Sequence, residues 1–378
     1  MSKRIWFGYF FFLVSLVVYS YTQIDLNLTL SSNGIYQYFQ NQLINLGYFN
    51  RPLSTEIFIV LVSFLFLIWW LVLRVIKRRM MTTKVFWLLV GVTVGILFFS
   101  YSAFSHDLFN YMFDVRIIAK YQDNPYMHKA LDYQGDLWVR FMHWTHRTYP
   151  YGPVWLIVTV PLSMFGMEKF VLTMGLFRLL FTVIYIGNIF LIHKLLKWFK
   201  VPDALWNTAF FAFNPLIIIE SLVSPHLDSV MLFFWLLGLY FFSQKKKVFG
   251  FLSLIGSAGV KFVTIVTLPL FFIPKLLKSP RSLVNWSASV FLLALTIPVY
   301  QRELYAWYFI PFVGMVALST NRYLQVICVG ISIAALLRYA PYFYFGEYGG
   351  ITQTWQQIIT ATIFFTTSLY LAKTYARS

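Results

Sequence analysis

Long apolar runs separated by short polar stretches make up most of the chain. A helix that crosses a bilayer needs roughly 20 apolar residues, because each adds about 1.5 Å towards a hydrocarbon core of about 30 Å. The pattern predicts ten helices, and hence an all-α polytopic membrane protein. They cover residues 5–21, 56–76, 85–103, 170–196, 204–223, 229–242, 284–300, 307–318, 324–337 and 354–372. The first run follows Lys3 and Arg4 without a clear small-residue cleavage site, so we expect a retained signal-anchor helix.

Two further apolar stretches break this alternation. Residues 153–165 form a short run, and residues 248–274 have basic residues at both ends and Gly-Ser-Ala-Gly at 256–259 near their middle. We expect the second stretch to break at these glycines, with its tip inside the membrane or a cavity, or else to form two tilted ordinary helices. With these stretches the bundle has about 10–13 transmembrane or re-entrant helices.

Composition supports the membrane interpretation. The 378 residues are 59% hydrophobic and only 11% charged, whereas soluble domains are about 45–50% apolar and about 25% charged. We therefore predict a single membrane domain, residues 1–378. Its parts are a helix hairpin (1–84), a core (85–318) with an outside loop (104–152), and C-terminal helices (319–378).

The net charge of +17 would also suit a nucleic-acid-binding protein. The basic residues, however, fall in short clusters between apolar runs, as expected for cytoplasmic loops of a membrane protein. The clusters are Arg74, Lys77, Arg78, Arg79 and Lys84; Lys194, Lys197 and Lys200; Lys245, Lys246 and Lys247; and Lys275, Lys278 and Arg281. We expect a multi-pass cell-membrane protein with both termini in the cytoplasm and no nucleic-acid partner. Residues 23–55, 104–152, 224–228, 301–305 and 338–353 then face outside.

Residues 104–152 differ from the rest of the chain. They contain five of the 13 acidic residues and four of the six histidines, interleaved with Tyr and Trp. This mixture suits carbohydrate, which offers hydroxyls to bond and apolar ring faces to stack; the alternative is a solvated loop with an interfacial aromatic belt. Asp107 lies just past a predicted outer helix end, where a carboxylate can act as a general base or simply end a helix. His106 beside it could assist, bind a metal or face water. Asp-x-Asp does not occur, so the sequence does not imply a divalent metal.

Other ionisable residues lie at helix ends or within apolar runs. His226 and Asp228 occupy a tight turn shortly after Glu220, and the turn is either functional or a plain connection in which Asp228 caps a helix. Lys261 and Arg178 are isolated cations in apolar sequence. An unpaired cation in lipid costs at least about 2.5–3.5 kcal/mol, so each needs an anion: a substrate phosphate, or one of the two carboxylates Glu220 and Asp228.

Together these residues make the chain resemble the GT-C superfamily of membrane glycosyltransferases. It is most similar to polyprenyl-phosphate-mannose-dependent mannosyltransferases and the glycosyltransferase 87 group, and more distantly to the first mannosyltransferase of GPI-anchor synthesis. The similar stretches are SHDLFNYMFDVRIIAKYQDNPY (105–126), YPYGPVWL (149–156), FNPLIIIESLVSPHLDS (213–229), GVKFVTIVTLP (259–269) and AWYFIPF (306–312). The first 80 residues carry no such signal. The family's later turn often reads Gly-His-Asn-Asp, whereas this chain has Ser224-Pro225-His226-Leu227-Asp228.

The resemblance implies an inverting transferase of the cell envelope that moves a hexose, with mannose expected, from a polyprenyl-phosphate sugar to a glycan or lipid-linked acceptor on the extracytoplasmic side. Asp107 would accept the acceptor's proton, and Lys261, helped by Arg178, would stabilise the departing phosphate. The remaining expected substrate-binding residues are His106, Tyr111, Tyr126, Tyr149, Tyr151, His226 and Asp228. No cofactor is expected, and participation of a divalent metal stays open. The alternative is a transporter or flippase of a lipid-linked or anionic substrate, whose polar residues would line a path through the bilayer.

Overall fold

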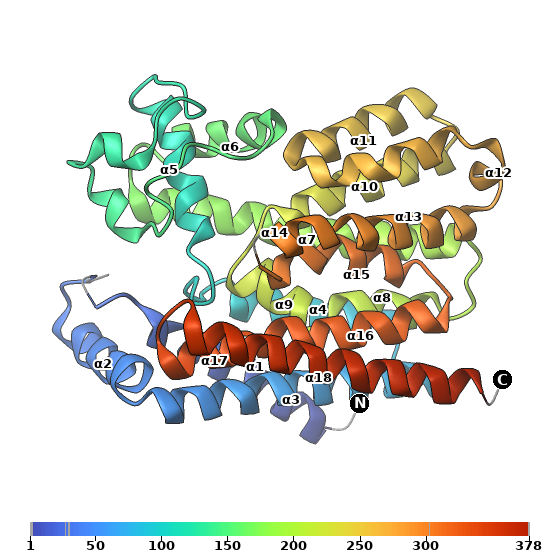
Figure 1. Cartoon of the computed structure of the whole chain (residues 1–378), viewed down its shortest axis with the longest axis horizontal. Helices are drawn as coiled ribbons and strands as arrows, with labels where there is room; N and C mark the ends of the chain where they lie inside the picture. The colour runs from blue at the N-terminus through green and yellow to red at the C-terminus, as the bar shows by residue number, and fades with distance from the viewer. Residues whose placement is uncertain (1–2, 27, 29–30, 302, 377–378) are drawn as a thin grey trace.

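The computed structural model describes residues 3–26, 28, 31–301 and 303–376, and this part of the chain is built from helices without a β-strand. Most long helices lie side by side along the longest dimension of the molecule (Figure 1). The α-helices are α1 (Lys3–Ser20), α2 (Gly34–Ile44), α3 (Arg51–Lys77), α4 (Thr83–Leu97), α5 (Asp107–Ala119), α6 (Pro153–Phe165), α7 (Phe170–Trp198), α8 (Ala204–Ala212), α9 (Pro215–Ile218), α10 (Asp228–Ser243), α11 (Lys247–Val260), α12 (Pro274–Leu277), α13 (Pro280–Ala294), α14 (Thr296–Gln301), α15 (Ile310–Ala317), α16 (Arg322–Leu337), α17 (Tyr339–Phe345) and α18 (Gly350–Tyr375). Shorter 3-10 or π turns are η1 (Tyr21–Gln23), η2 (Asn45–Phe49), η3 (Ala130–Tyr133), η4 (Leu137–Phe141), η5 (Ile219–Val223), η6 (Phe262–Phe272) and η7 (Ala306–Phe309).

All ten predicted apolar runs are helical over most of their length, which confirms an all-α polytopic membrane protein. By length and composition, four helical stretches of the described residues can cross a bilayer, or five if the bent pair α8–α9 counts as one span. The four are Arg51–Lys77, Phe170–Trp198, Pro280–Tyr300 and Arg322–Phe345. Several other apolar helices are shorter, with 10–17 residues.

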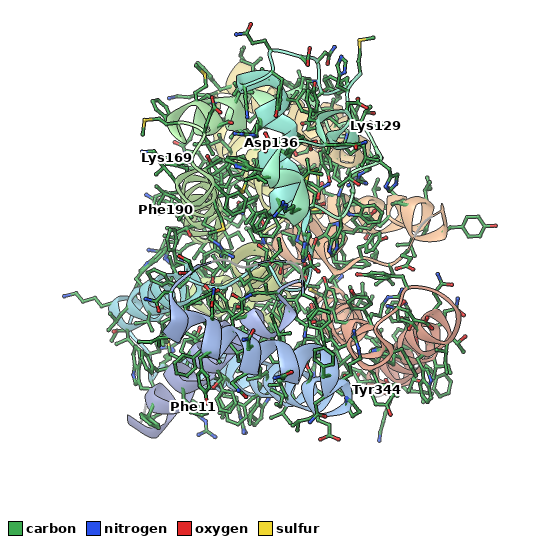
Figure 2. The ribbon with its side chains drawn as sticks, turned by 90° about the vertical axis from the view of Figure 1, so that its left-hand side faces the viewer. Phe11, Lys129, Asp136, Lys169, Phe190 and Tyr344 are labelled. Atoms are coloured by element: carbon green, nitrogen blue, oxygen red, sulfur yellow. The ribbon has the colours of Figure 1, made fainter. Side chains whose placement is uncertain are left out.

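Large apolar side chains cover the outside of the bundle. Phe7, Phe10 and Phe11 on α1 and Phe190 on α7 are exposed, and Phe11 and Phe190 are labelled in Figure 2. Soluble monomers rarely expose contiguous apolar patches of this kind. A lipid environment removes the penalty, because hydrocarbon tails are as apolar as these side chains.

The predicted helix at 204–223 is broken, with a bend of 50° between α8 and α9. Asn214 and Pro215 explain the break. Pro215 has no N–H to continue the helix and disfavours helical geometry at the residue before it. The Asn214 side chain accepts a hydrogen bond from the N–H of Leu216 at 2.9 Å and so starts the next turn. The break directs the following π turn and residues 224–227 towards the start of α10.

The stretch 248–274 also breaks, but not at the glycines, so that prediction was wrong in its position. Residues 256–259 are helical, and the chain turns at Lys261, whose backbone is extended with φ −153° and ψ 127°. The glycines instead allow close packing. A Cβ at Gly259 would lie 2.6 Å from Val154 Cγ2, and one at Gly152 would lie 2.1 Å from the Gly259 carbonyl oxygen. The N–H of Gly152 donates to the Val260 carbonyl at 3.1 Å, which joins the start of α6 to the end of α11.

The expected outside loop 104–152 is mostly ordered and partly helical. Its helix α5 is buried along nearly its whole length and packs against α6 and α7. Arg116 of α5 forms an ion pair of 2.7 Å with Asp136 and lies 4.0 Å from the centre of the Trp138 ring. Figure 2 shows Asp136 and Lys129 in this region, well away from Phe11 of α1. These contacts make the region a cap over one end of the bundle.

The opposite end carries basic loops. The Arg281 guanidinium donates to the carbonyls of Phe199 and Lys200 at 3.2 and 3.4 Å, which brings two of the predicted basic clusters together. In Figure 1, α12 and the C-terminus lie at this end, and α5 lies at the other. The tertiary structure therefore separates the basic loops from the acidic and aromatic cap.

Candidate active site

A cavity of about 580 Å³ lies between the cap and the bundle. Residues from six parts of the chain line it: the start of α5, the segment before α6, the start of α10, the α11–η6 junction, the α13–α14 junction and the segment around η7. The lining residues are Asp107, Trp144, His146, Arg147, Pro150, Tyr151, Asp228, Lys261, Phe262, Val263, Leu295, Pro298, Glu303, Tyr305, Trp307 and Tyr308. The cavity thus unites four residues predicted as site residues from well-separated motifs: Asp107, Tyr151, Asp228 and Lys261.

Asp107 is the first residue of α5 and is 4% exposed. Its backbone N–H donates a hydrogen bond of 3.2 Å to Ser105 Oγ, and its Oδ2 accepts a long hydrogen bond of 3.4 Å from the Tyr111 hydroxyl. Its Oδ1 has no hydrogen-bond partner among the described residues. Asp107 therefore lines the cavity and keeps one buried oxygen without a hydrogen-bond partner.

Asp107 is followed by two further buried ionisable groups, His226 and then Glu220. His226 Nε2 is 3.8 Å from Asp107 Oδ2, and His226 Nδ1 is 3.1 Å from Glu220 Oε2. The second contact has the length of a hydrogen bond but not its alignment. The Tyr339 hydroxyl donates to the other Glu220 oxygen at 3.0 Å. The imidazole is fixed by stacking on Trp307, with ring centres 4.1 Å apart.

The surroundings of His226 favour its charged form. Burial alone would lower its pKa, but the neighbouring carboxylates of Glu220 and Asp107 outweigh burial, so the pKa of His226 is raised above its ordinary value. The His226 ring lies between the Glu220 and Asp107 carboxylates and helps to hold Asp107 in place. His226, which was expected to bind substrate, is fully buried and does not line the cavity, so its connection to the site is through Asp107.

Lys261 and Asp228 form an ion pair across the cavity wall. Lys261 Nζ lies 2.9 and 3.1 Å from the two Asp228 oxygens and 4.5 Å from the centre of the Tyr308 ring. The Asp228 side chain is 2% exposed, whereas that of Lys261 is 23% exposed. Of the two carboxylates expected as partners for Lys261, Asp228 is therefore the one that it contacts, and the ammonium still reaches the cavity.

The other predicted site residues take different places. Tyr151 lines the cavity. Tyr111 reaches the site only through its hydrogen bond of 3.4 Å to Asp107 Oδ2. Tyr126 and Tyr149 instead brace the segment before α6, since their hydroxyls donate to the carbonyls of Tyr151 and Gly152 at 3.1 and 2.8 Å.

Six of the predicted site residues are not among those that line the cavity: His106, Tyr111, Tyr126, Tyr149, Arg178 and His226. The buried Arg178 donates to the carbonyls of Leu222 and Val223 at 3.2 and 3.3 Å, at the end of the π turn. His106 points towards Asp25 and His143, with Nδ1 3.7 Å from Asp25 Oδ2.

The sequence analysis did not predict five of the lining residues, namely Arg147, Glu303, Tyr305, Trp307 and Tyr308. Arg147 carried a usable signal, because it is a basic residue in a segment assigned to the outside, against the positive-inside rule. Its guanidinium lies 4.8 Å from the centre of the Trp144 ring. Arg147 adds a second cation to the cavity beside Lys261.

Comparison with known families decides the class of the protein. A family model described as alpha-(1->6)-mannopyranosyltransferase, N-terminal domain, matches residues 28–275. The chain belongs to this family. It is therefore a membrane mannosyltransferase, and the resemblance to GT-C enzymes is confirmed. The match starts at residue 28, so the expectation that the first 80 residues carry no family signal was wrong. Comparison with curated proteins and with solved structures gave no significant match.

In this mannosyltransferase the matched region contains Asp107, Glu220, His226, Asp228 and Lys261. The far wall of the cavity, from Leu295 to Tyr308, comes from beyond the match. The cavity is therefore lined by residues inside the matched region and by residues that follow it.

Proposed function

We propose that this mannosyltransferase takes its mannosyl group from a polyprenyl-phosphate sugar and transfers it, with inversion, to a glycan or lipid-linked acceptor on the extracytoplasmic side. One observation carries the proposal. A buried carboxylate with an unengaged oxygen, Asp107, shares a cavity with the partly exposed ammonium of Lys261. A base and a cation in one cavity suit attack by a hydroxyl and departure of a phosphate.

Asp107 acts as the general base. Its Oδ1 accepts the proton of the acceptor hydroxyl as that oxygen bonds to the anomeric carbon, and the bond from the anomeric carbon to the phosphate oxygen breaks. His226 and Glu220 hold Asp107 from the side away from the cavity. A base positioned in this way typically contributes about 10²–10⁴-fold to the rate.

Lys261 and Arg147 stabilise the departing phosphate. A fixed cation near developing negative charge lowers the barrier most where water is excluded. Beside Lys261 the cavity wall is apolar, formed by Phe262, Val263, Leu295 and Pro298. This wall offers a surface for the first isoprene units of a lipid-linked sugar donor, which a nucleotide sugar would not need.

The distribution of charge supports an outward-facing site in the cell membrane. The basic loops gather at the end of the bundle opposite the cap, and such loops stay on the cytoplasmic side. Reporter fusions after Ser378 and within residues 134–148 should report opposite sides of the membrane, and signals from one side only would contradict this orientation.

Asp107→Asn tests the reaction. Purified protein is incubated with radiolabelled mannosyl phosphate on a polyprenyl carrier and, following the family description, with an alpha-(1->6)-linked mannose disaccharide as acceptor. Asn keeps the shape of Asp but accepts no proton at neutral pH, so we expect roughly a 10²–10⁴-fold loss of transfer with little change in thermal stability.

Asp132→Asn is the matched control, because it removes a carboxylate of the same cap outside the cavity lining, and it should keep wild-type activity. Transfer by Asp107→Asn within a few-fold of wild type would exclude Asp107 as the base. Transfer from GDP-mannose but not from the polyprenyl carrier would refute the proposed sugar donor.

A further inference from the structure

A second cluster of ionisable side chains lies beside the cavity but faces away from it. It consists of Asp25, between η1 and α2, His106, just before α5, and His143, just after η4. One ligand atom from each lies within 4.8 Å of the others. His106 and His143 stack with ring centres 3.7 Å apart and planes 12° apart.

We propose that Asp25, His106 and His143 bind a first-row divalent transition-metal ion, with zinc as the best match. Two imidazoles and one carboxylate form a donor set suited to such an ion, whereas calcium and magnesium prefer oxygen ligands.

The two carboxylate–imidazole distances are close to those of a zinc site. Asp25 Oδ2 lies 3.7 Å from His106 Nδ1 and 3.6 Å from His143 Nε2. In a tetrahedral zinc site with bonds of about 2.0–2.1 Å, ligand atoms are about 3.3–3.4 Å apart. The two carboxylate–imidazole pairs therefore need to approach by only a few tenths of an ångström. The imidazole nitrogens lie within 4.8 Å of each other on stacked rings, so one ring must also turn for both lone pairs to meet at one ion, and His143, whose side chain is 42% exposed, has room to turn.

Neighbouring groups complete the site. The Phe141 carbonyl oxygen lies 3.0 Å from His106 Nδ1, so binding of the ion requires Nδ1 to give up any proton that it donates there. Water then occupies the fourth position, as in other zinc sites with three protein ligands. The Tyr48 hydroxyl donates to the other Asp25 oxygen at 3.5 Å. Such outer contacts orient the ligating oxygen towards the ion.

The ion acts as a structural clamp. It joins three segments that are far apart in the sequence, and His106 directly precedes Asp107, the candidate base. Metal binding therefore fixes the start of α5, while the cavity lining contains none of the three ligands. The site does not depend on which sugar donor the enzyme uses.

Metal content and thermal stability test this site in detergent-purified full-length protein from which any histidine tag has been removed. Wild type should hold about one zinc per chain after dialysis, and chelator should lower its melting temperature. His143→Ala should weaken zinc binding at least about tenfold and abolish the effect of the chelator. The matched control is His128→Ala, which removes an exposed histidine of the same cap that lies 3.7 Å from one carboxylate, Asp132, and is not part of the cluster. It should behave as wild type.

Cobalt substitution gives a readout on the unaltered protein. Wild type titrated with Co²⁺ should develop the visible absorption of a four-coordinate nitrogen and oxygen site, and zinc should abolish it. Absence of this absorption in wild type, or equal zinc content in wild type and His143→Ala, would overturn the proposal. These measurements do not involve transfer, so they can fail while the proposed reaction stands.

Discussion

The ion pair between Lys261 and Asp228 predicts an asymmetric effect of removing either partner. Lys261→Met keeps the length of the side chain but leaves the Asp228 carboxylate, which is 2% exposed, without its cation. Asp228→Asn leaves Lys261, which is 23% exposed and can turn its ammonium towards the cavity. We therefore expect Lys261→Met to destabilise the empty protein more than Asp228→Asn does.

The magnitude follows from the geometry. Removing one partner of a fully buried pair costs about 3–5 kcal/mol, and access of the pair to the cavity reduces this to about 2–3 kcal/mol for Lys261→Met. The exposed ammonium left by Asp228→Asn should cost about 1 kcal/mol. At roughly 2 °C per kcal/mol for a large chain, Lys261→Met should lower the melting temperature by about 4–6 °C and Asp228→Asn by about 2 °C. The double variant should be closer to Asp228→Asn, because no buried carboxylate remains.

Thermal unfolding in detergent, with and without polyprenyl-phosphate mannose, measures both roles of Lys261. Sugar donor at about 100 times its Kd should stabilise wild type by about 2.7 kcal/mol, or about 5 °C, and stabilise Lys261→Met much less. Melting of both single variants within 1 °C of wild type would show that the pair contributes no stability. Equal stabilisation of wild type and Lys261→Met by the sugar donor would refute the phosphate role.

Three further predictions concern the supports of the site. Gly152→Ala should abolish transfer and lower the melting temperature, because its Cβ would lie 2.1 Å from the Gly259 carbonyl oxygen. The control is Gly175→Ala, whose Cβ would have open space around it. Equal effects of the two substitutions would contradict this packing argument. Arg178→Met should cost about 1–3 kcal/mol of stability by leaving two buried carbonyls without donors, but should keep sugar-donor binding; selective loss of binding in a calorimetric titration would restore the phosphate role for Arg178. Burial raises the pKa of Asp114 from 3.8 to about 7, with Arg147 opposing and Asp107 adding to the shift, so the stability contributed by its protonated form is complete below about pH 4 and lost as pH rises to about 7. Asp114→Asn should therefore melt at the wild-type temperature near pH 4 and above it at pH 8, and a difference that does not grow with pH would contradict the shift.

Helix positions and membrane character could be predicted from the sequence because they depend on local properties. A run of apolar residues meets the requirement of the bilayer wherever it lies in the chain, and every buried backbone group of a helix is satisfied within the helix itself. The run 170–196 illustrates this, since α7 spans Phe170–Trp198. The motif containing Asp107 could be recognised in the same way, because a carboxylate at the end of an apolar run is unusual.

Breaks and ordered polar segments needed the tertiary structure. The Gly-Ser-Ala-Gly segment at 256–259 predicted a helix break. In the structure, the absence of a side chain at Gly259 instead allows the close contact between α11 and the start of α6. The polar segment 104–152 read as a loop, but α5 within it is stabilised by burial against α6 and α7. Packing partners distant in sequence decide both outcomes, and a local pattern does not contain them.

The sequence indicated which types of residue form the site, and the fold decided which individual residues belong to it. Asp107, Asp228 and Lys261 were recognisable because each charge in apolar sequence needs a partner. Which partner each charge takes depends on distances in three dimensions, which the sequence does not give. Only the tertiary structure shows that Lys261 contacts Asp228, that Arg178 donates hydrogen bonds to backbone carbonyls, and that Asp25 lies beside two histidines. Electrostatic and hydrogen-bond energies fall off within a few ångströms, so side chains more than a hundred residues apart can form one site that their order along the chain does not reveal.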